Sequence, residues 1–221
     1  MRKSMKYKNF LFDLDGTLVD SYMGVTNAVL HSLTYYPEIP TPKREELRVF
    51  IGPPLYNSYT KYFGMDDKTA HEAIAHYREY YSVTGKYECE LFDGLREMLE
   101  RLKQNGKRVV MATSKPEVFA KDIAKHHKID GYFDHICGAD MGGPISEKDQ
   151  VIAYLLKKSG YQKNETLMIG DTLFDVEGAE KNGIDCVAVT YGYGTKKELL
   201  NSSAVAVVDT VSELADLLLC D

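Results

Sequence analysis

The sequence predicts an α/β fold, a doubly wound parallel sheet core with an inserted all-helical domain. Three observations support this prediction. The apolar run Asn9-Phe10-Leu11-Phe12-Asp13 has the length and composition of a strand buried on both faces, as in parallel sheets. After about residue 92, short apolar runs alternate with amphipathic helical patterns. Between these two parts, residues 21–91 show helical periodicity and no strong strand pattern.

Bulk composition limits the classes of function. The chain has 221 residues, enough for a core domain and a smaller second one. Hydrophobic residues make up 44% and charged residues 27%, as in an ordinary globular protein. The formal net charge of −6 argues against a nucleic acid polymer or an anionic membrane surface as partner. An anionic substrate would need local cations to hold it.

Cysteine usage and the N-terminus bear on location. Cys89, Cys137, Cys186 and Cys220 are widely spaced, without a CxxC pair or a metal-ligand cluster. We expect reduced, structural thiols and a cytoplasmic protein. Residues 1–8 are basic but lack the apolar segment of a signal peptide, and no stretch is long enough to span a bilayer.

The inserted segment is expected to be helical throughout. Residues at helical spacing form two sets, Val25, Val29 and Leu33, then Ala70, Ile74, Tyr77 and Tyr81. Between them, Gly52-Pro53-Pro54 predicts a rigid non-helical loop. The expected domains are therefore residues 1–20 with 92–221 for the core and residues 21–91 for the insertion.

The elements of the core follow in order along the chain. Asp93 is expected to cap a helix that buries Leu95, Met98 and Leu102 and ends at Gly106. The remaining expected strands are 108–113, 135–138, 166–170, 186–190 and 204–208, and the remaining helices are 115–127, 147–158, 173–182 and a last one through 219. Gly160 and Gly183 are expected to end two of these helices.

Polar side chains with catalytic potential follow the predicted strands. Ligands of open α/β sheets bind beyond the carboxyl ends of the strands, so these positions converge on one edge. The candidates are Asp13 and Asp15 after the first strand, Thr113 and Ser114 after the second, Lys148 at the start of a helix, and Asp171 and Asp175 after strand 166–170.

Each candidate also has a structural interpretation. An aspartate at a strand end is often a turn or capping residue, and Asp20 and Ser21 fit simple capping of the first inserted helix. Asp175 could serve only as an acid in the first turn of its helix. Lys148 lies in a charged run that could be solvated, and Lys115 is a rival cation because it follows Thr113 and Ser114 directly.

Three other motifs are excluded. A calcium loop starting at Asp13 would need Gly and Glu where the chain has Leu18 and Gly24. Gly192-Tyr193-Gly194 lacks the third glycine and the helix-opening context of a dinucleotide fingerprint. No GxxxxGK[ST] sequence is present, which argues against a P-loop nucleotide hydrolase.

The ordered set of motifs resembles the haloacid dehalogenase superfamily. It consists of Asp13-Leu14-Asp15-Gly16-Thr17-Leu18-Val19-Asp20, then Thr113, then Lys148, then Gly170-Asp171-Thr172-Leu173-Phe174-Asp175. The pattern spans the whole catalytic core and implies a Rossmann-like fold. The insertion resembles the helical cap of the phosphoglycolate-phosphatase-like subgroup, and loop 50–55 resembles its substrate-facing loop.

The resemblance implies roles for the core residues. Asp13 would attack phosphorus and carry an aspartyl-phosphate. Asp15 would protonate the leaving alcohol and later activate water, and an acid at this position favours transfer from an oxygen leaving group over dehalogenation. Thr113 Oγ and the Ser114 amide would hold phosphoryl oxygens, and Lys148 would place a cation near the transferring group.

The resemblance also implies Mg²⁺ as cofactor. Mg²⁺ would offset the repulsion between a carboxylate nucleophile and an anionic phosphate. The implied metal ligands are the carboxylates of Asp13 and Asp171 and the backbone carbonyl of Asp15. Asp175 would have a supporting role, through waters or by orienting a neighbour.

The implied activity is hydrolysis of a small phosphate monoester, with a cap that closes over the core and selects the leaving group. Arg48, Gly52 and Pro53 are the candidate selecting residues. Phosphoglycolate, a nucleoside monophosphate and pyrophosphate are the candidate substrates. The alternatives are 5'-nucleotidase or pyrophosphatase activity, a β-phosphoglucomutase-like phosphomutase, and a receiver-like phospho-aspartate switch, which the long insertion argues against. The partner is a small phosphorylated metabolite, and the expected state is a monomer or weak homodimer.

Overall fold

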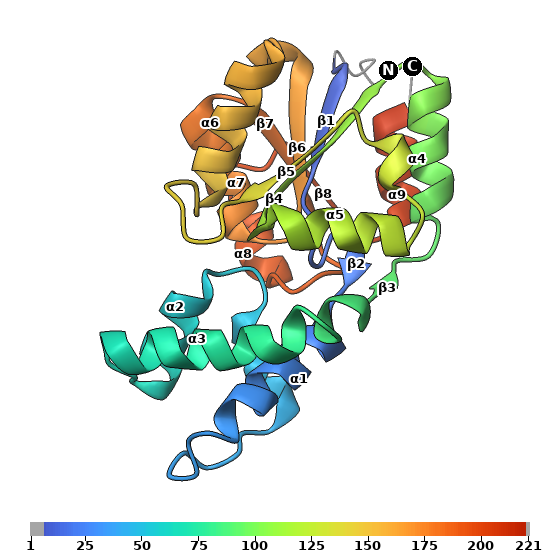
Figure 1. Cartoon of the computed structure of the whole chain (residues 1–221). Helices are drawn as coiled ribbons and strands as arrows, with labels where there is room; N and C mark the ends of the chain where they lie inside the picture. Colours follow the sequence, from blue (N-terminus) through green and yellow to red (C-terminus); the bar gives the residue numbers. More distant parts are fainter. Residues whose placement is uncertain (1–6, 220–221) are drawn as a thin grey trace. The chain divides into compact units, whose positions relative to one another are not determined.

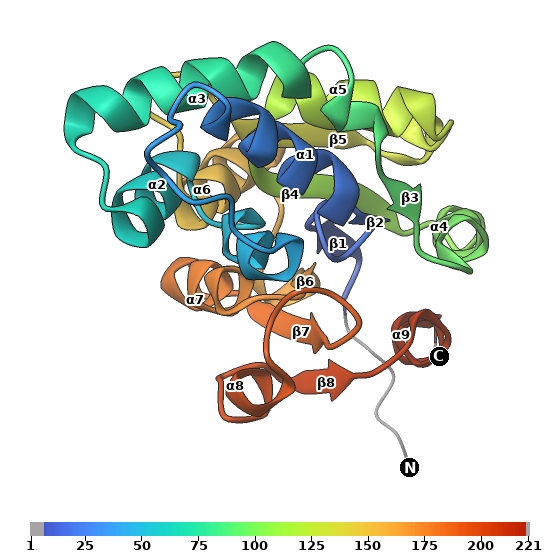
Figure 2. The ribbon, with the colours of Figure 1, turned by 90° about the horizontal axis from the view of Figure 1, so that it is seen from below.

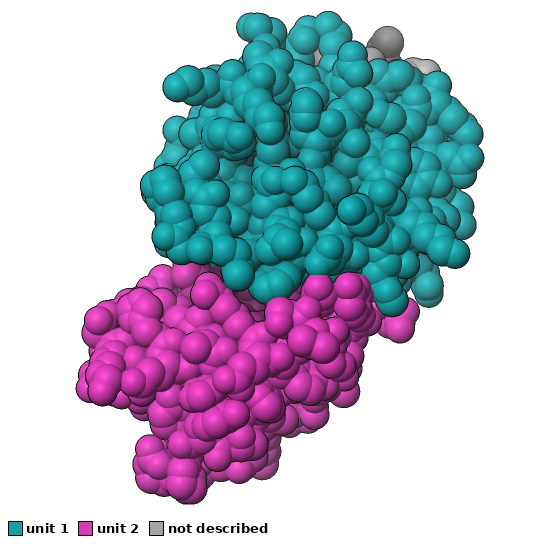
Figure 3. Space-filling model, viewed as in Figure 1, with its two compact units in different colours: residues 1–19, 91–221 teal, residues 20–90 magenta. Residues whose placement is uncertain are grey.

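The chain forms two compact units. The computed structural model describes residues 7–219 (Figure 1). One unit comprises residues 1–19 and 91–221, and the other comprises residues 20–90 (Figure 3). Cys220 and most of the basic N-terminal stretch lie outside the described residues. We refer to the two parts as the α/β unit and the helical unit.

The α/β unit contains a parallel sheet, which confirms the predicted fold class. Its strands occur in the order β5-β4-β1-β6-β7-β8, and each neighbouring pair is parallel. The strands are β1 (Asn9–Phe12), β4 (Arg108–Pro116), β5 (His135–Ala139), β6 (Thr166–Gly170), β7 (Asp185–Val189) and β8 (Ala206–Val208). The chain winds outward from β1 in both directions, so the carboxyl end of β1 is the topological switch point, where ligands bind in such sheets.

Helices cover both faces of this sheet. They are α4 (Leu95–Gln104), α5 (Glu117–His126), α6 (Lys148–Ser159), α7 (Leu173–Asn182), α8 (Lys196–Leu200) and α9 (Val211–Leu219). Seen from below, α6 and α7 lie on one side of the strands, and α4 and α9 lie on the other (Figure 2). On the first side, Leu11 and Met168 of the sheet pack in one buried cluster with Val151, Leu155 and Val176 of the helices. Such contacts fix the sheet that presents the strand ends.

The helical unit has its own core. Its elements are α1 (Tyr22–Leu33), η1 (Arg44–Phe50), α2 (Leu55–Phe63), α3 (Asp67–Tyr81) and η2 (Gly85–Tyr87). Tyr59 is fully buried beside Phe50, and its hydroxyl shares a 2.5 Å hydrogen bond with Ser32. The two-residue strands β2 (Val19–Asp20) and β3 (Glu90–Leu91) pair where the chain enters and leaves this unit.

Several local expectations are confirmed and others are wrong. Gly160 and Gly183 end α6 and α7 in the left-handed conformation, as predicted. Asp93 does not cap α4, whose N-cap is Gly94. The helix predicted from residue 115 begins instead at Glu117, because β4 continues to Pro116 and pairs there with Ala139 of β5. The short helix α8 was not predicted.

Two further observations concern the described residues. Cys89, Cys137 and Cys186 are buried, and Cys137 and Cys186 belong to the hydrophobic cluster beside the sheet. Within residues 7–219, no helix has both the length and the apolar character required to cross a membrane.

Candidate active site

The first site segment is the turn after β1. Strand β1 is buried along its whole length, so the chain emerges from the core at Asp13. The Asp13 amide donates to the Ile169 carbonyl at 2.9 Å, which extends the pairing with β6 by one residue. Gly16 then turns the chain with a φ of 80°, a value that favours glycine. As a result, Asp13 and Asp15 are both held nearly buried at the switch point, with 6% and 9% exposure.

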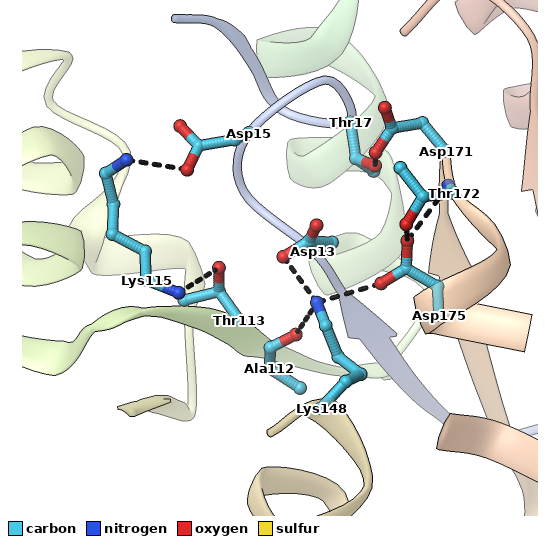
Figure 4. Close-up of polar contacts among 10 residues, drawn as sticks. All are labelled: Asp13, Asp15, Thr17, Ala112, Thr113, Lys115, Lys148, Asp171, Thr172 and Asp175. Atoms are coloured by element: carbon cyan, nitrogen blue, oxygen red, sulfur yellow. Dashed lines mark hydrogen bonds and ion pairs between the residues drawn. The ribbon is translucent and has the colours of Figure 1, made fainter. Parts of the chain in front are cut away.

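Lys148 joins two carboxylates at this edge. Its Nζ lies 2.6 Å from Asp13 Oδ1 and 2.8 Å from Asp175 Oδ1, and it donates to the Ala112 carbonyl at 3.1 Å (Figure 4). Only 5% of the side chain is exposed. The alternative that Lys148 belongs to a solvated charged run is therefore wrong. Lys148 is the first residue of α6, which starts at this point with a capping box between Glu147 and Gln150.

The turn from β6 to α7 carries two more aspartates of the site, Asp171 and Asp175, and both are fully buried. Asp175 Oδ2 accepts hydrogen bonds from the amide and the hydroxyl of Thr172, so Asp175 caps α7 and contacts Lys148 with its other oxygen. Asp171 Oδ1 accepts from the Thr17 hydroxyl at 3.2 Å, and Asp171 Oδ2 accepts from the Tyr193 amide at 2.7 Å. Capping and site contact are thus combined in Asp175.

The end of β4 supplies the third segment. Thr113 is buried, and its Oγ1 accepts the Lys115 amide at 3.2 Å. Lys115 Nζ donates to Asp15 Oδ2 at 2.6 Å, with both side chains nearly buried. Figure 4 shows this pair on one side of Asp13, away from Asp171 and Asp175. Ser114 lies between Thr113 and Lys115 in the extended strand. The two lysines that competed as candidates therefore contact different aspartates.

The electrostatics favour a further cation in the acidic cluster. Burial raises the pKa of Asp13 to about 6, an effect that Lys148 opposes and Asp175 and Asp15 reinforce. Burial and the nearby charges of Asp175 and Asp13 raise the pKa of Asp171 well above its ordinary value. Burial lowers the pKa of Lys148, but the two carboxylates it contacts more than compensate and raise it, so the lysine stays charged. If all three buried carboxylates are ionised, the single ammonium leaves negative charge uncompensated, and a bound cation would offset it.

The same cluster fits a magnesium ion. One carboxylate oxygen from each of Asp13, Asp171 and Asp175 lies within 4.8 Å of the other two. Carboxylate oxygens are the donors that Mg²⁺ prefers, and Mg²⁺ commonly keeps several waters, so few protein ligands are needed. The Asp15 carboxylate is engaged by Lys115, and a metal-binding role for the Asp15 backbone carbonyl stays a prediction.

Some contacts of the site were not anticipated. Thr17 and Tyr193 both donate to Asp171, and Thr172 donates to Asp175. A signal existed for Tyr193, because the glycine-rich segment after strand β7 starts at the same edge of the sheet as the other candidates.

Arg48, Gly52 and Pro53 lie in the helical unit. The Arg48 guanidinium lies 5.6 Å from the centre of the Tyr22 ring, within range of a cation–π interaction. Gly52 has a φ of 102°, which fits the predicted non-helical loop before α2. The selecting role of these three residues stays a prediction.

Comparison with known proteins identifies the class. The family model described as haloacid dehalogenase-like hydrolase matches residues 10–189. The chain is 43% identical over 196 residues to a 5'-nucleotidase of Pseudomonas aeruginosa, covering 89% of this chain and 88% of that protein. It is 35% identical over 211 residues to tyrosine-protein kinase PtkA of Mycobacterium tuberculosis, covering 94% and 71%. Two Pseudomonas proteins named phosphoglycolate phosphatase match at 30% and 28% identity.

A solved structure agrees with this result. The crystal structure of a predicted phosphatase from Clostridium acetobutylicum superposes with a TM-score of 0.92 at 41% identity, covering 96% of this chain and 98% of that one. The chain therefore belongs to the haloacid dehalogenase-like hydrolases. Within that family it is a phosphatase.

Proposed function

We propose that this phosphatase hydrolyses a small phosphate monoester with Mg²⁺, using Asp13 as nucleophile and Asp15 as general acid and base. The observation that carries the proposal is the division of the carboxylates. Asp13 lies in the acidic cluster with Asp171 and Asp175, whereas Asp15 is held apart by Lys115. This division supports separate roles, with Asp13 beside the candidate metal ligands and Asp15 as the group proposed to exchange a proton with the leaving oxygen.

The proposed reaction has two displacements. Asp13 attacks phosphorus, the bond to the leaving oxygen breaks, and Asp15 gives its proton to that oxygen. Asp15 then takes a proton from water, the water oxygen attacks phosphorus, and the bond to Asp13 breaks, which releases phosphate. Lys148, the Thr113 hydroxyl and the Ser114 amide hold the phosphoryl oxygens. Bound Mg²⁺, held by Asp13 and Asp171 with Asp175 in support, would supply positive charge that offsets repulsion between nucleophile and phosphate.

We further propose a nucleoside 5'-monophosphate as the leading substrate. The support is the 43% identity to a protein named 5'-nucleotidase, against 30% for one named phosphoglycolate phosphatase. The helical unit would act as the cap that selects the leaving group, with Arg48, Gly52 and Pro53 as candidate contacts. Phosphoglycolate and pyrophosphate are the competing substrates on the same core, because the core residues contact only the phosphoryl group.

The experiment that tests this function measures phosphate release from nucleoside monophosphates, phosphoglycolate, pyrophosphate and hexose phosphates. Each is assayed with Mg²⁺ and with a chelator. We expect release to require Mg²⁺ and to be fastest with a nucleoside monophosphate. Equal release in the chelator would contradict the metal dependence, and preference for another class would replace the substrate. No phosphate release, together with isomerisation of a hexose phosphate that requires a sugar bisphosphate, would indicate a phosphomutase.

Replacing Asp15 by asparagine should separate the two steps. Asp15→Asn removes the proton donor and acceptor but leaves Asp13 and Lys148 in place. With a leaving group that needs no protonation, such as p-nitrophenolate, we expect a burst of product followed by a turnover about 10²- to 10⁴-fold slower than wild type. Rapid-quench kinetics and mass spectrometry of the intact protein would detect the phosphorylated intermediate.

The control for this variant is the exposed Asp93→Asn, which should keep wild-type kinetics. A steady state without any burst, at an unchanged rate, would show that Asp15 is not the acid and base.

A further inference from the structure

The loop after β7, residues 191–194, packs against the acidic cluster. Its sequence, Tyr-Gly-Tyr-Gly, matches no dinucleotide fingerprint. The Tyr193 amide donates to Asp171 Oδ2 at 2.7 Å, and the Tyr191 hydroxyl donates to the Thr17 carbonyl at 3.2 Å. The Thr17 hydroxyl in turn donates to Asp171 Oδ1. The loop is therefore linked to both oxygens of Asp171, directly at one and through Thr17 at the other.

Three glycines approach Asp171 so closely that a Cβ at any of them would overlap it. A Cβ built on Gly192 would lie 2.3 Å from Asp171 Oδ2, and one built on Gly194 would lie 2.0 Å from the Asp171 carbonyl oxygen. A Cβ on Gly16, in the turn after β1, would lie 2.1 Å from the same Oδ2 atom. Contacts below about 3 Å are well inside van der Waals distance. We call Gly16, Gly192 and Gly194 the glycine socket of Asp171.

We infer that residues 191–194, together with Gly16, position Asp171 as a metal ligand, through the Tyr193 amide and the glycine socket. Each carboxylate oxygen has two lone pairs, so an oxygen that accepts one hydrogen bond can still bind a metal. Groups that hydrogen-bond to a ligand fix its orientation and contribute to metal affinity. The inference rests on the proposed function, because it takes Asp171 to be a ligand of Mg²⁺.

The mutation that tests this inference is Gly192→Ala. Its methyl group would overlap Asp171 Oδ2 and the Gly16 carbonyl oxygen, so the carboxylate or the loop must move. We expect the dissociation constant for Mg²⁺, measured by calorimetry on chelator-treated protein, to rise about 10- to 100-fold. The matched control is Gly131→Ala, because a Cβ at Gly131 has no neighbour within 4 Å. That variant should bind Mg²⁺ as wild type does.

A purely structural role would give a different pattern. It would lower the melting temperature in chelator but leave the dissociation constant of the folded protein unchanged. Tyr191→Phe provides a second measurement that does not depend on the folding of Gly192→Ala. Loss of its hydroxyl should weaken Mg²⁺ binding about two- to tenfold, as expected for one hydrogen bond.

The outcomes are distinguishable from failure of the proposed function. If wild type binds Mg²⁺ and both Gly192→Ala and Tyr191→Phe bind it equally well, the positioning role is overturned and the proposed function stands. If wild type itself binds no Mg²⁺, the proposed function is overturned, and this inference with it.

Discussion

Asp13→Asn should reduce phosphate release by about 10⁴-fold or more, as removal of a covalent nucleophile does in other enzymes. An amide oxygen cannot form the phosphorylated intermediate. We expect no other residue of the cluster to replace Asp13 as nucleophile. The measurement compares initial rates of phosphate release by Asp13→Asn and by wild type, with the best substrate of the panel and at saturating Mg²⁺. Asp93→Asn, an exposed aspartate of the same unit, is the control and should keep the wild-type rate.

Asp13→Asn should be no less stable than wild type when both are measured in chelator. Burial raises the pKa of Asp13 to about 6 from its ordinary value of 3.8. Because the folded-state pKa is the higher one, the contribution of this group to stability is full below pH 3.8 and is lost as pH rises through about 6. Near neutral pH the charge of Asp13 therefore destabilises the metal-free fold, and neutral asparagine removes that cost.

Two results would contradict the assignment of Asp13. A wild-type rate in Asp13→Asn would remove Asp13 as nucleophile. A large loss of stability, seen as a lower melting temperature in chelator, would mean that the low activity comes from unfolding. We also expect Mg²⁺ to raise the melting temperature of Asp13→Asn less than that of wild type, because one carboxylate ligand is missing.

The placement of the candidate residues could be predicted because strand ends are marked in the sequence. Apolar runs stop at Phe12 and Gly170, and the aspartates that follow must lie at one edge of a parallel sheet. Asp13, Asp171 and Asp175 accordingly lie together. Helix ends with glycine at the C-terminus, such as α6 and α7, were predictable for the same local reason.

Features that depend on distant contacts could not be predicted. Lys115 follows a buried run and looks like the start of a helix, but β4 continues past it to Pro116, which pairs with Ala139 of β5. Helix α8 has only five residues, too few to show a periodicity. The partner of Lys115 is Asp15, 100 positions away in the chain. No local pattern indicates such a pair.

The burial of Lys148 is the clearest case of this limit, because its sequence neighbours are charged. The prediction that depends on it is that Lys148→Met destabilises the protein by about 3–5 kcal/mol in chelator, near neutral pH. Methionine fills similar volume but leaves Asp13 and Asp175 without the ammonium that contacts both. Urea unfolding of variant and wild type measures the difference, and phosphate release should fall as well.

The pH dependence and a matched lysine make this prediction specific. Lys148 lowers the pKa of Asp13, so its removal raises that pKa further. The deficit in stability should then be greatest above neutral pH and should shrink as pH falls and Asp13 takes up a proton. Lys115→Met, which removes the ammonium beside Asp15 and not the one shared by Asp13 and Asp175, should cost less. Mg²⁺ should recover part of the loss in Lys148→Met, because it replaces positive charge in the same cluster. An unfolding midpoint equal to wild type at high pH in chelator would mean that Lys148 does not balance these carboxylates.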